Sequence, residues 1–207
     1  MLSARQLFCE RDDRVLFDSL DFDLAEGEVL QVQGGNGSGK TTLLRIICGL
    51  HDSFEGAISW YGDPIEKQRE LFYSSLLYMG HRVGVNKILS PLENLRWSCS
   101  MHGSTTPTQI ESALAQLGLR GYENSPCHML SAGQQQRVSL ARLLISPAKL
   151  WVLDEPFTTL DAHGVKDLEN LLANHVDNGG SVLVTTHHKL NVSSGIHYLK
   201  LDDVGHD

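Results

Sequence analysis

The residues with the clearest chemical meaning lie between positions 34 and 42, where the chain reads GGNGSGKTT. This segment matches the pattern G-x-x-x-x-G-K-S/T, between a stretch typical of a strand and one typical of a helix. Glycines let backbone N–H groups curl around phosphate oxygens, and a helix N-terminus favours negative charge. We therefore expect Lys40 to reach the β- and γ-phosphates of a nucleoside triphosphate and the Thr41 hydroxyl to ligate Mg²⁺. The residues expected around the nucleotide are Gly34, Gly35, Asn36, Gly37, Ser38, Gly39, Lys40, Thr41 and Thr42.

A second candidate site is a pair of carboxylates, Asp154 and Glu155, directly after the apolar residues 150–153 (LWVL). In open α/β sheets ligands bind beyond the carboxyl ends of the strands, where this stretch would place Asp154. We expect Asp154 to hold Mg²⁺, directly or through water. Because strand side chains alternate, Glu155 points elsewhere and is free to orient an attacking water. A strand ending in Asp-Glu is weak evidence alone, but beside the glycine loop it indicates nucleotide hydrolysis.

Two further positions could contact a phosphate. Ser131 opens a predicted helix, and its hydroxyl together with the helix N-terminus forms an anion site with no neighbouring strand to complete it. His187 follows the predicted strand at 181–185. A histidine at a strand end is more often a solvated loop residue than a catalytic one, so its position alone leaves both interpretations open. His188, beside it, should point away.

These residues must be positioned by a sheet. Turn-rich segments separate strands from helices in alternating order, which favours a largely parallel sheet wrapped by helices. Strands are predicted at 28–33, 58–61, 76–79, 150–153, 181–185 and 198–201, and a helix at 39–48.

Between about residues 89 and 146 the strand signals vanish and helix signals crowd together. Thr106 and Gln109 flank a proline at the first helical position, and Ser131 and Gln134 repeat the same Ser/Thr-x-x-Gln spacing. In each pair the hydroxyl and the amide can serve two otherwise unpaired backbone N–H groups, so both pairs predict a helix start. We predict a helical lobe inserted into an α/β core.

Composition argues against several classes of protein. Seventeen Lys and Arg against 25 Asp and Glu give a net charge of −8, which argues against nucleic acid as a partner and against docking on an anionic membrane surface. No apolar run is long enough to span a bilayer, and the N-terminus lacks the apolar core of a signal peptide, so we expect a soluble cytoplasmic protein. The four cysteines and ten histidines show no spacing suited to zinc or haem, so no direct haem ligand is evident.

With these motifs in this order, the chain resembles the ATP-binding cassette (ABC) ATPases over nearly its whole length. LSAGQ at 130–134 resembles the signature motif, FTTLD at 157–161 the D-loop, and TTH at 185–187 the switch histidine region. The resemblance implies a P-loop NTPase fold, a single ABC nucleotide-binding domain over residues 1–207. Such a domain has a mostly parallel core sheet flanked by helices, an N-terminal antiparallel β part and an inserted helical subdomain, here at about 89–146.

The same resemblance implies ATP and Mg²⁺ as cofactors and a second copy of the chain as a partner. In the family, the signature of one subunit closes on ATP held by the phosphate loop of the other. Ser131, Gly133 and Gln134 would then approach the γ-phosphate on the opposite subunit, with Asp161 of the D-loop beside the nucleotide. His187 would hydrogen-bond the γ-phosphate and help to hold the attacking water. The resemblance thus assigns catalytic and metal-binding roles to Lys40, Glu155, His187, Thr41 and Asp154.

Three positions depart from the general family pattern. The usual adenine-stacking aromatic falls at Arg11, so a guanidinium would stack on the base, and we expect modest nucleotide affinity. His81 takes the place of the Q-loop glutamine, which touches Mg²⁺, water and the membrane partner. Ala132 replaces a signature glycine and adds a methyl group where backbone and phosphate approach closely. Because every expected catalytic side chain is present, an active ATPase is favoured, and a weakly active one stays open.

More narrowly, the segments at 7–17, 76–95, 130–143 and 150–161 resemble the CcmA family, the ATP-binding subunits of the bacterial cytochrome c maturation system. That family implies a peripheral subunit at the cytoplasmic face of the inner membrane, with integral membrane partners resembling CcmB and CcmC. ATP hydrolysis would support haem delivery to c-type cytochromes by releasing a haem-loaded chaperone from CcmC. Residues 81–94 and the helical lobe should receive membrane helices. An ATPase subunit for another substrate and a nucleotide-sensing module with little turnover are the alternatives.

Overall fold

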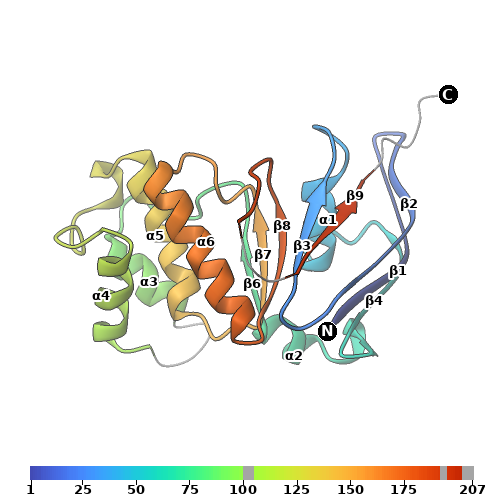
Figure 1. Ribbon diagram of the computed structural model, residues 1–207, viewed down its shortest axis with the longest axis horizontal. Helices are drawn as coiled ribbons and strands as arrows, with labels where there is room; N and C mark the ends of the chain where they lie inside the picture. The colour runs from blue at the N-terminus through green and yellow to red at the C-terminus, as the bar shows by residue number, and fades with distance from the viewer. Residues whose placement is uncertain (100–104, 192–194, 202–207) are drawn as a thin grey trace.

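The centre of the molecule is a parallel sheet (Figure 1). In this computed structural model, which describes residues 1–99, 105–191 and 195–201, the sheet has five strands in the order β6-β7-β8-β3-β9. They are β3 (Val29–Gln33), β6 (Leu76–Met79), β7 (Leu150–Asp154), β8 (Ser181–Thr185) and β9 (Ile196–Lys200). Neighbouring strands pair in parallel throughout, so their carboxyl ends meet at one edge, the upper edge in Figure 1.

A second, antiparallel sheet is built mainly from the N-terminal part of the chain. Its strands lie in the order β2-β1-β4-β5. They are β1 (Leu2–Arg11), β2 (Arg14–Leu24), β4 (Glu55–Trp60) and β5 (Asp63–Pro64). Asp12 and Asp13 connect β1 to β2 with φ of 53° and 58°, the left-handed geometry that suits a tight hairpin. The mostly parallel core with an N-terminal antiparallel part, which the family resemblance implies, is therefore confirmed.

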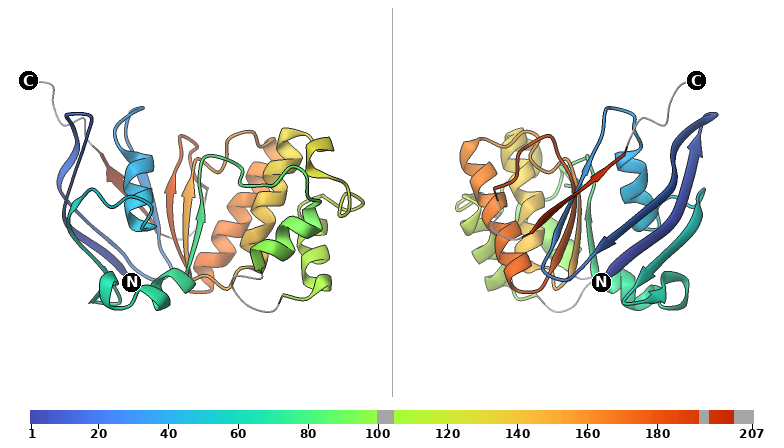
Figure 2. Two further views of the ribbon diagram at one scale, coloured as in Figure 1. Left: turned by 180° about the vertical axis from the view of Figure 1, so that it is seen from behind. Right: turned by 45° about the vertical axis from the view of Figure 1, so that its right-hand side comes forward.

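Helices cover both faces of the parallel sheet (Figure 2). Helix α1 lies between the two sheets, whereas α3, α4, α5 and α6 lie on the opposite face (Figure 1). The helices are α1 (Lys40–Ile47), α2 (Arg69–Ser74), α3 (Pro91–Cys99), α4 (Pro107–Gln116), α5 (Ala132–Ile145) and α6 (Ala162–Asp177), with short 3₁₀ turns η1 (Ile65–Lys67) and η2 (Cys127–Met129). Within the described residues no helix has the length and apolar character needed to cross a membrane.

Alternating side chains of the parallel strands divide the interior into two cores. Leu150 and Val152 of β7 pack in the core that contains α1 and the antiparallel sheet. Trp151 and Leu153 of the same strand pack in the core formed with the helices of the opposite face. A strand that is buried on both faces is held firmly, so the loops at its carboxyl end start from fixed positions.

The predicted helix starts at Thr106 and Ser131 are confirmed. Each hydroxyl accepts the backbone N–H of the glutamine three residues later, and that glutamine side chain accepts the backbone N–H of the capping residue. The predicted strands are also present, although β4 begins three residues earlier than expected. Residues 55–57 are exposed yet pair with β1, so hydrophobicity gave no signal for them.

Candidate functional site

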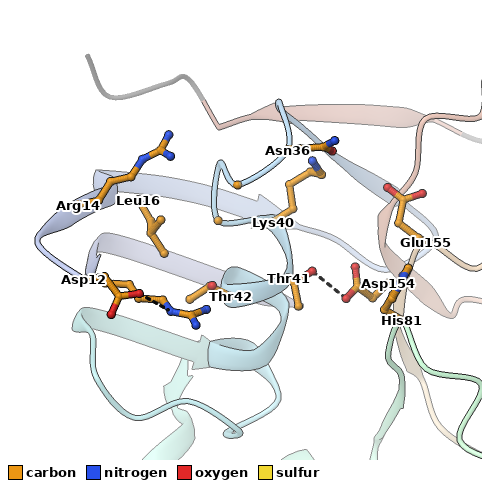
Figure 3. Close-up of a pocket in the computed structure, with 13 residues that line it drawn as sticks. Asp12, Arg14, Leu16, Asn36, Lys40, Thr41, Thr42, His81, Asp154 and Glu155 are labelled. Carbon is orange, nitrogen blue, oxygen red and sulfur yellow. Dashed lines mark hydrogen bonds and ion pairs between the residues drawn. The ribbon is translucent and has the colours of Figure 1, made fainter. Parts of the chain in front are cut away.

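A pocket of about 480 Å³ opens at the carboxyl edge of the parallel sheet (Figure 3). Its walls come from the β1–β2 hairpin, the glycine loop with the start of α1, His81 after β6, and the end of β7. The predicted site residues that line it are Arg11, Asn36, Gly37, Gly39, Lys40, Thr41, Thr42, His81, Asp154 and Glu155. A smaller hollow that shares Lys40 is lined also by Gly34 and His187.

The glycine loop has the backbone geometry of a phosphate cradle. Gly37 and Gly39 have φ of 82° and 94°, a left-handed conformation that side chains with a Cβ rarely adopt. A Cβ on Gly39 would also lie 3.0 Å from the Leu16 Cβ of β2. The Lys40 ammonium donates to the carbonyl oxygens of Gly34 and Gly35, both at 2.8 Å. Lys40 therefore lies folded over the loop, at the mouth of α1.

One polar atom of this loop is buried without a partner in the structure. The Ser38 hydroxyl is inaccessible and makes no hydrogen bond among the described residues. A buried hydroxyl without a partner is costly, and a phosphate oxygen is an acceptor that it could satisfy. This side chain therefore fits a loop that closes around phosphate.

The Asp154 carboxylate connects the glycine loop to the end of β8. Its Oδ2 accepts the Thr41 hydroxyl at 2.9 Å, and its Oδ1 accepts the Thr185 hydroxyl at 2.8 Å. Asp154 and Thr185 are register partners in the sheet, so the pairing follows from strand alignment. The Thr41 and Asp154 oxygens form the hard donor set that Mg²⁺ prefers. Burial and, next, the charge of Asp154 raise the pKa of Tyr78 to about 12, so this neighbouring phenol stays protonated.

Glu155 and His187 lie next to each other beyond the strand ends. Glu155 has a left-handed φ of 51°, an uncommon conformation that is held by two hydrogen bonds from its N–H, to the carbonyl and the hydroxyl of Thr185. The Glu155 Oε1 lies 3.6 Å from His187 Nε2, and the His187 side chain is 70% exposed. Glu155 is turned away from the contact between Thr41 and Asp154 (Figure 3). Glu155 lines the pocket, whereas His187 lines the smaller hollow beside Gly34 and Lys40.

Arg11 and His81 both line the pocket. Arg11 lines the pocket from the end of β1, with its Nε 3.4 Å from an Asp12 carboxylate oxygen. His81 lines the wall beside Asp154 and is exposed. Both can reach a ligand in the pocket without rearrangement of buried groups.

Of the predicted residues outside this pocket, four lie on the helical side of the molecule. They are Ser131, Gly133, Gln134 and Asp161. Ser131 and the neighbouring Ala132 are exposed at the start of α5. Asp161 caps α6 through the Gly164 N–H and binds Arg137 with both oxygens at 2.9 Å. These contacts, with the Gly164 N–H first, lower the pKa of Asp161. One copy of the chain does not bring these four residues to the glycine loop.

Comparison with known proteins identifies the family. A family model described as ABC transporter matches residues 17–158. The chain belongs to the ABC transporter family. The cassette superposes with a TM-score of 0.82 and 24% identity on a putative ABC transporter ATP-binding protein from Pyrococcus furiosus, covering 97% of this chain and 96% of that one. It also superposes with a TM-score of 0.82 and 24% identity on the ATP-binding cassette MJ0796, in a dimeric post-hydrolysis state bound to ADP and Pi. The match covers 97% of this chain and 95% of that one. The predicted ABC ATPase fold is therefore confirmed.

Curated relatives of the cassette are similar over nearly its full length. It is 49% identical over 204 residues to the cytochrome c biogenesis ATP-binding export protein CcmA of Hahella chejuensis, covering 99% of this chain and 97% of the relative. It is 51% identical over 205 residues to the protein of the same name from Vibrio vulnificus, covering 98% of this chain and 100% of that one. The resemblance to the CcmA family is confirmed by these relatives.

Some residues of the site were not singled out from the sequence of the cassette. Thr185 bridges Asp154 and the backbone of Glu155, and Arg14 and Leu16 of β2 line the pocket. Thr185 could have been found, because it is a polar residue ending a buried strand whose neighbour ends in Asp154. Arg14 gave no comparable signal, since its approach to the glycine loop depends on how the hairpin packs.

Proposed function

We propose that this chain is the ATP-hydrolysing subunit of a membrane ABC complex that serves cytochrome c maturation. The observation that carries the proposal is the gathering of Lys40, Thr41, Asp154 and Glu155 at one pocket on the carboxyl edge of the sheet. These are the cation, metal ligands and base that phosphoryl transfer to water requires. The curated relatives of about the same length, named CcmA, support the biological role.

The residues of the pocket fit MgATP. Backbone N–H groups of the glycine loop and the Ser38 hydroxyl would bind the phosphate oxygens, and Lys40 would turn its ammonium from the loop carbonyls to the β- and γ-phosphates. Thr41 and Asp154 would hold Mg²⁺, which neutralises the charge that develops on the phosphates. Arg11 would stack on the adenine from the hairpin.

In the hydrolytic step, Glu155 orients a water molecule and accepts its proton. The water oxygen attacks the γ-phosphorus as the bond to the β–γ bridging oxygen breaks, which yields ADP and phosphate. His187 donates a hydrogen bond to the γ-phosphate and helps to hold the water. The two hydrogen bonds from the Glu155 N–H to Thr185 hold the backbone of Glu155 at its positive φ, and so fix the point from which the carboxylate extends. A catalytic group acts best when its position is fixed beforehand.

A second copy of the chain would complete the site. The start of α5, with the Ser131 hydroxyl, is exposed and lies outside the pocket of its own copy. A helix N-terminus attracts anions, so Ser131, Gly133 and Gln134 of each copy would face the γ-phosphate bound by the other. MJ0796, which has the same fold, is dimeric in its post-hydrolysis state. ATP binding would close two copies face to face, and hydrolysis would open them.

Integral membrane subunits resembling CcmB and CcmC would bind the two copies at the cytoplasmic face of the inner membrane and move as the copies close and open. A groove of about 550 Å³ between residues 84–98 and α5 offers a place for them. Trp97, which lines it, is 68% exposed. The groove also contains Arg142, whose Nε donates to the Ser98 hydroxyl at 3.2 Å. We propose that the role of the chain is mechanical: closing and opening of the two copies would move the membrane subunits.

The experiment is complementation of a bacterial strain that lacks this chain. We expect the strain to lose holo c-type cytochromes and to retain b-type cytochromes, because only the c-type require haem delivery by this system. The unchanged chain should restore them and Lys40→Ala should not. Lys149→Ala is the matched control, since Lys149 is exposed just before β7, at the opposite edge of the sheet. Normal c-type cytochromes in the deletion strain, or full rescue by Lys40→Ala, would contradict the proposal.

A further inference from the structure

The loop that carries His187 is anchored by the next residue, His188. His188 Nε2 lies 3.0 Å from the Oε1 of Glu169 in the middle of α6. A carboxylate only accepts, so the imidazole donates this hydrogen bond. The His188 backbone N–H also donates to the Thr186 hydroxyl at 2.9 Å. His187 is therefore followed directly by a residue with two fixed contacts.

Glu169 holds the loop at a second point. Its Oε1 also accepts the backbone N–H of Asn191 at 2.9 Å. The Glu169 side chain is only 15% exposed, against 35% for His188 and 70% for His187. One partly buried oxygen thus ties both ends of the segment 188–191 to α6, while the side chain of His187 extends into solvent.

His188 also contacts the segment that follows Glu155. Its ring lies against Phe157, with centroids 4.7 Å apart and an interplanar angle of 32°. Phe157 is 8% exposed and stands two residues after Glu155. The same imidazole therefore touches α6 through Glu169 and the chain beyond Glu155 through Phe157.

We propose that His188, held by Glu169, is a positioning residue that sets His187 against Glu155 for the hydrolytic step. This inference rests on the proposed function, since it assumes that Glu155 and His187 act on ATP. His187 Nε2 is 3.6 Å from the Glu155 Oε1, slightly beyond a normal hydrogen bond. A small movement of the loop changes that separation. His188 contacts Thr186, the residue before His187, and Phe157, two residues after Glu155.

The test compares kinetic constants of variants within the complex with its membrane subunits. We expect His188→Ala to lower kcat by about 10- to 100-fold with KM changed less than about twofold, because misplacing a catalytic group by about 1 Å costs that much after substrate has bound. His188→Gln keeps a donor for Glu169 and should recover most of kcat. Glu169→Gln keeps the acceptor oxygen and should be mild, whereas Glu169→Ala should resemble His188→Ala.

His197→Ala is the matched control. His197 lies on β9 with its Nε2 3.3 Å from a Glu28 carboxylate oxygen and is exposed, so the variant removes a histidine–glutamate pair away from the site. It should leave both kinetic constants unchanged. The thermal midpoint of each variant is measured alongside, because a loss of kcat that follows the loss of folded protein, without rescue by His188→Gln, would overturn the positioning role.

The outcomes separate this inference from the proposed function. If the unchanged complex hydrolyses ATP and His188→Ala does so at the same rate, the positioning role is wrong and the proposed function stands. If the unchanged complex binds MgATP but shows no turnover with its membrane subunits, the proposed function fails and the role of His188 fails with it.

Discussion

Both oxygens of the Asp154 carboxylate are hydrogen-bonded, one to Thr41 at the start of α1 and the other to Thr185 at the end of β8. Thr185 in turn accepts the N–H of Glu155. The proposed metal ligands and the proposed base are therefore joined by one short chain of hydrogen bonds. Because such a network is buried at Asp154, which is 4% exposed, loss of one member leaves another polar group without a partner.

Arg11 gives the first prediction at this scale. Arg11→Ala should weaken MgATP binding about fivefold, since stacking of a guanidinium on a partly exposed ring is worth about 1 kcal/mol. Titration calorimetry measures the change. Arg5→Ala is the control, because Arg5 also lies on β1 and pairs with a carboxylate, Asp23, but is absent from the pocket lining. Equal affinities for Arg11→Ala and the unchanged chain would count against stacking.

At the element scale, what the sequence could predict depends on how local the determining contacts are. The helix start at Ser131 was predictable because its partner, Gln134, is three residues away. The first residue of β4 was not predictable, because residues 55–57 are exposed and pair with β1, whose partner residues Arg5 and Phe8 lie far earlier in the chain. The hydrogen bond between His188, after β8, and Glu169 of α6 joins residues 19 positions apart. No pattern in the sequence indicates such a contact. From the sequence, His188 is therefore expected only to point away from the site.

Helix α6 packs on β7 through a stacked pair that makes stability depend on pH. The ring of His175 lies parallel to that of Trp151, with centroids 3.7 Å apart, and its Nε2 donates to the carbonyl of Lys149. Burial lowers the pKa of His175, opposed in smaller measure by its hydrogen bonds to Lys149 and Ser181. The folded state thus favours neutral imidazole.

The sign of the effect follows from proton linkage. Between the lowered pKa of the folded chain and about 6.5 in the unfolded chain, the unfolded state binds more protons, so stability falls as pH falls. The contribution is complete above about pH 6.5 and is lost through the folded pKa. His175→Phe keeps a ring on Trp151 but cannot titrate. We expect its urea midpoint to fall less than that of the unchanged chain between about pH 7.5 and about pH 5.5. Equal falls would assign the dependence to other groups.

At the scale of the whole molecule, the two halves of the proposed ATP site lie on opposite sides of the parallel sheet. Helix α1 with the glycine loop lies next to the antiparallel sheet, and α5 lies in the helical lobe (Figure 1). The sheet is buried on both faces, so bending it to bring the halves together within one copy would disrupt close packing. Two copies related by a twofold axis can bring each loop against the other's α5 without such bending.

Glu155→Gln tests that arrangement, because removing the base while keeping the side-chain size should let ATP bind without being consumed. We expect this variant to sediment as a dimer with MgATP and as a monomer without it. Each copy has a net charge of −8, so the measurement is made at about 0.15 M salt, where repulsion is screened beyond about 8 Å.

Adding Ser131→Glu should abolish the dimer, since a carboxylate at the start of α5 would face the γ-phosphate. Ser112→Glu adds the same charge on the exposed face of α4 and should leave the dimer intact. A monomer of Glu155→Gln at saturating MgATP, or a dimer that Ser131→Glu does not disturb, would show that the helix start of one copy does not meet the nucleotide of the other.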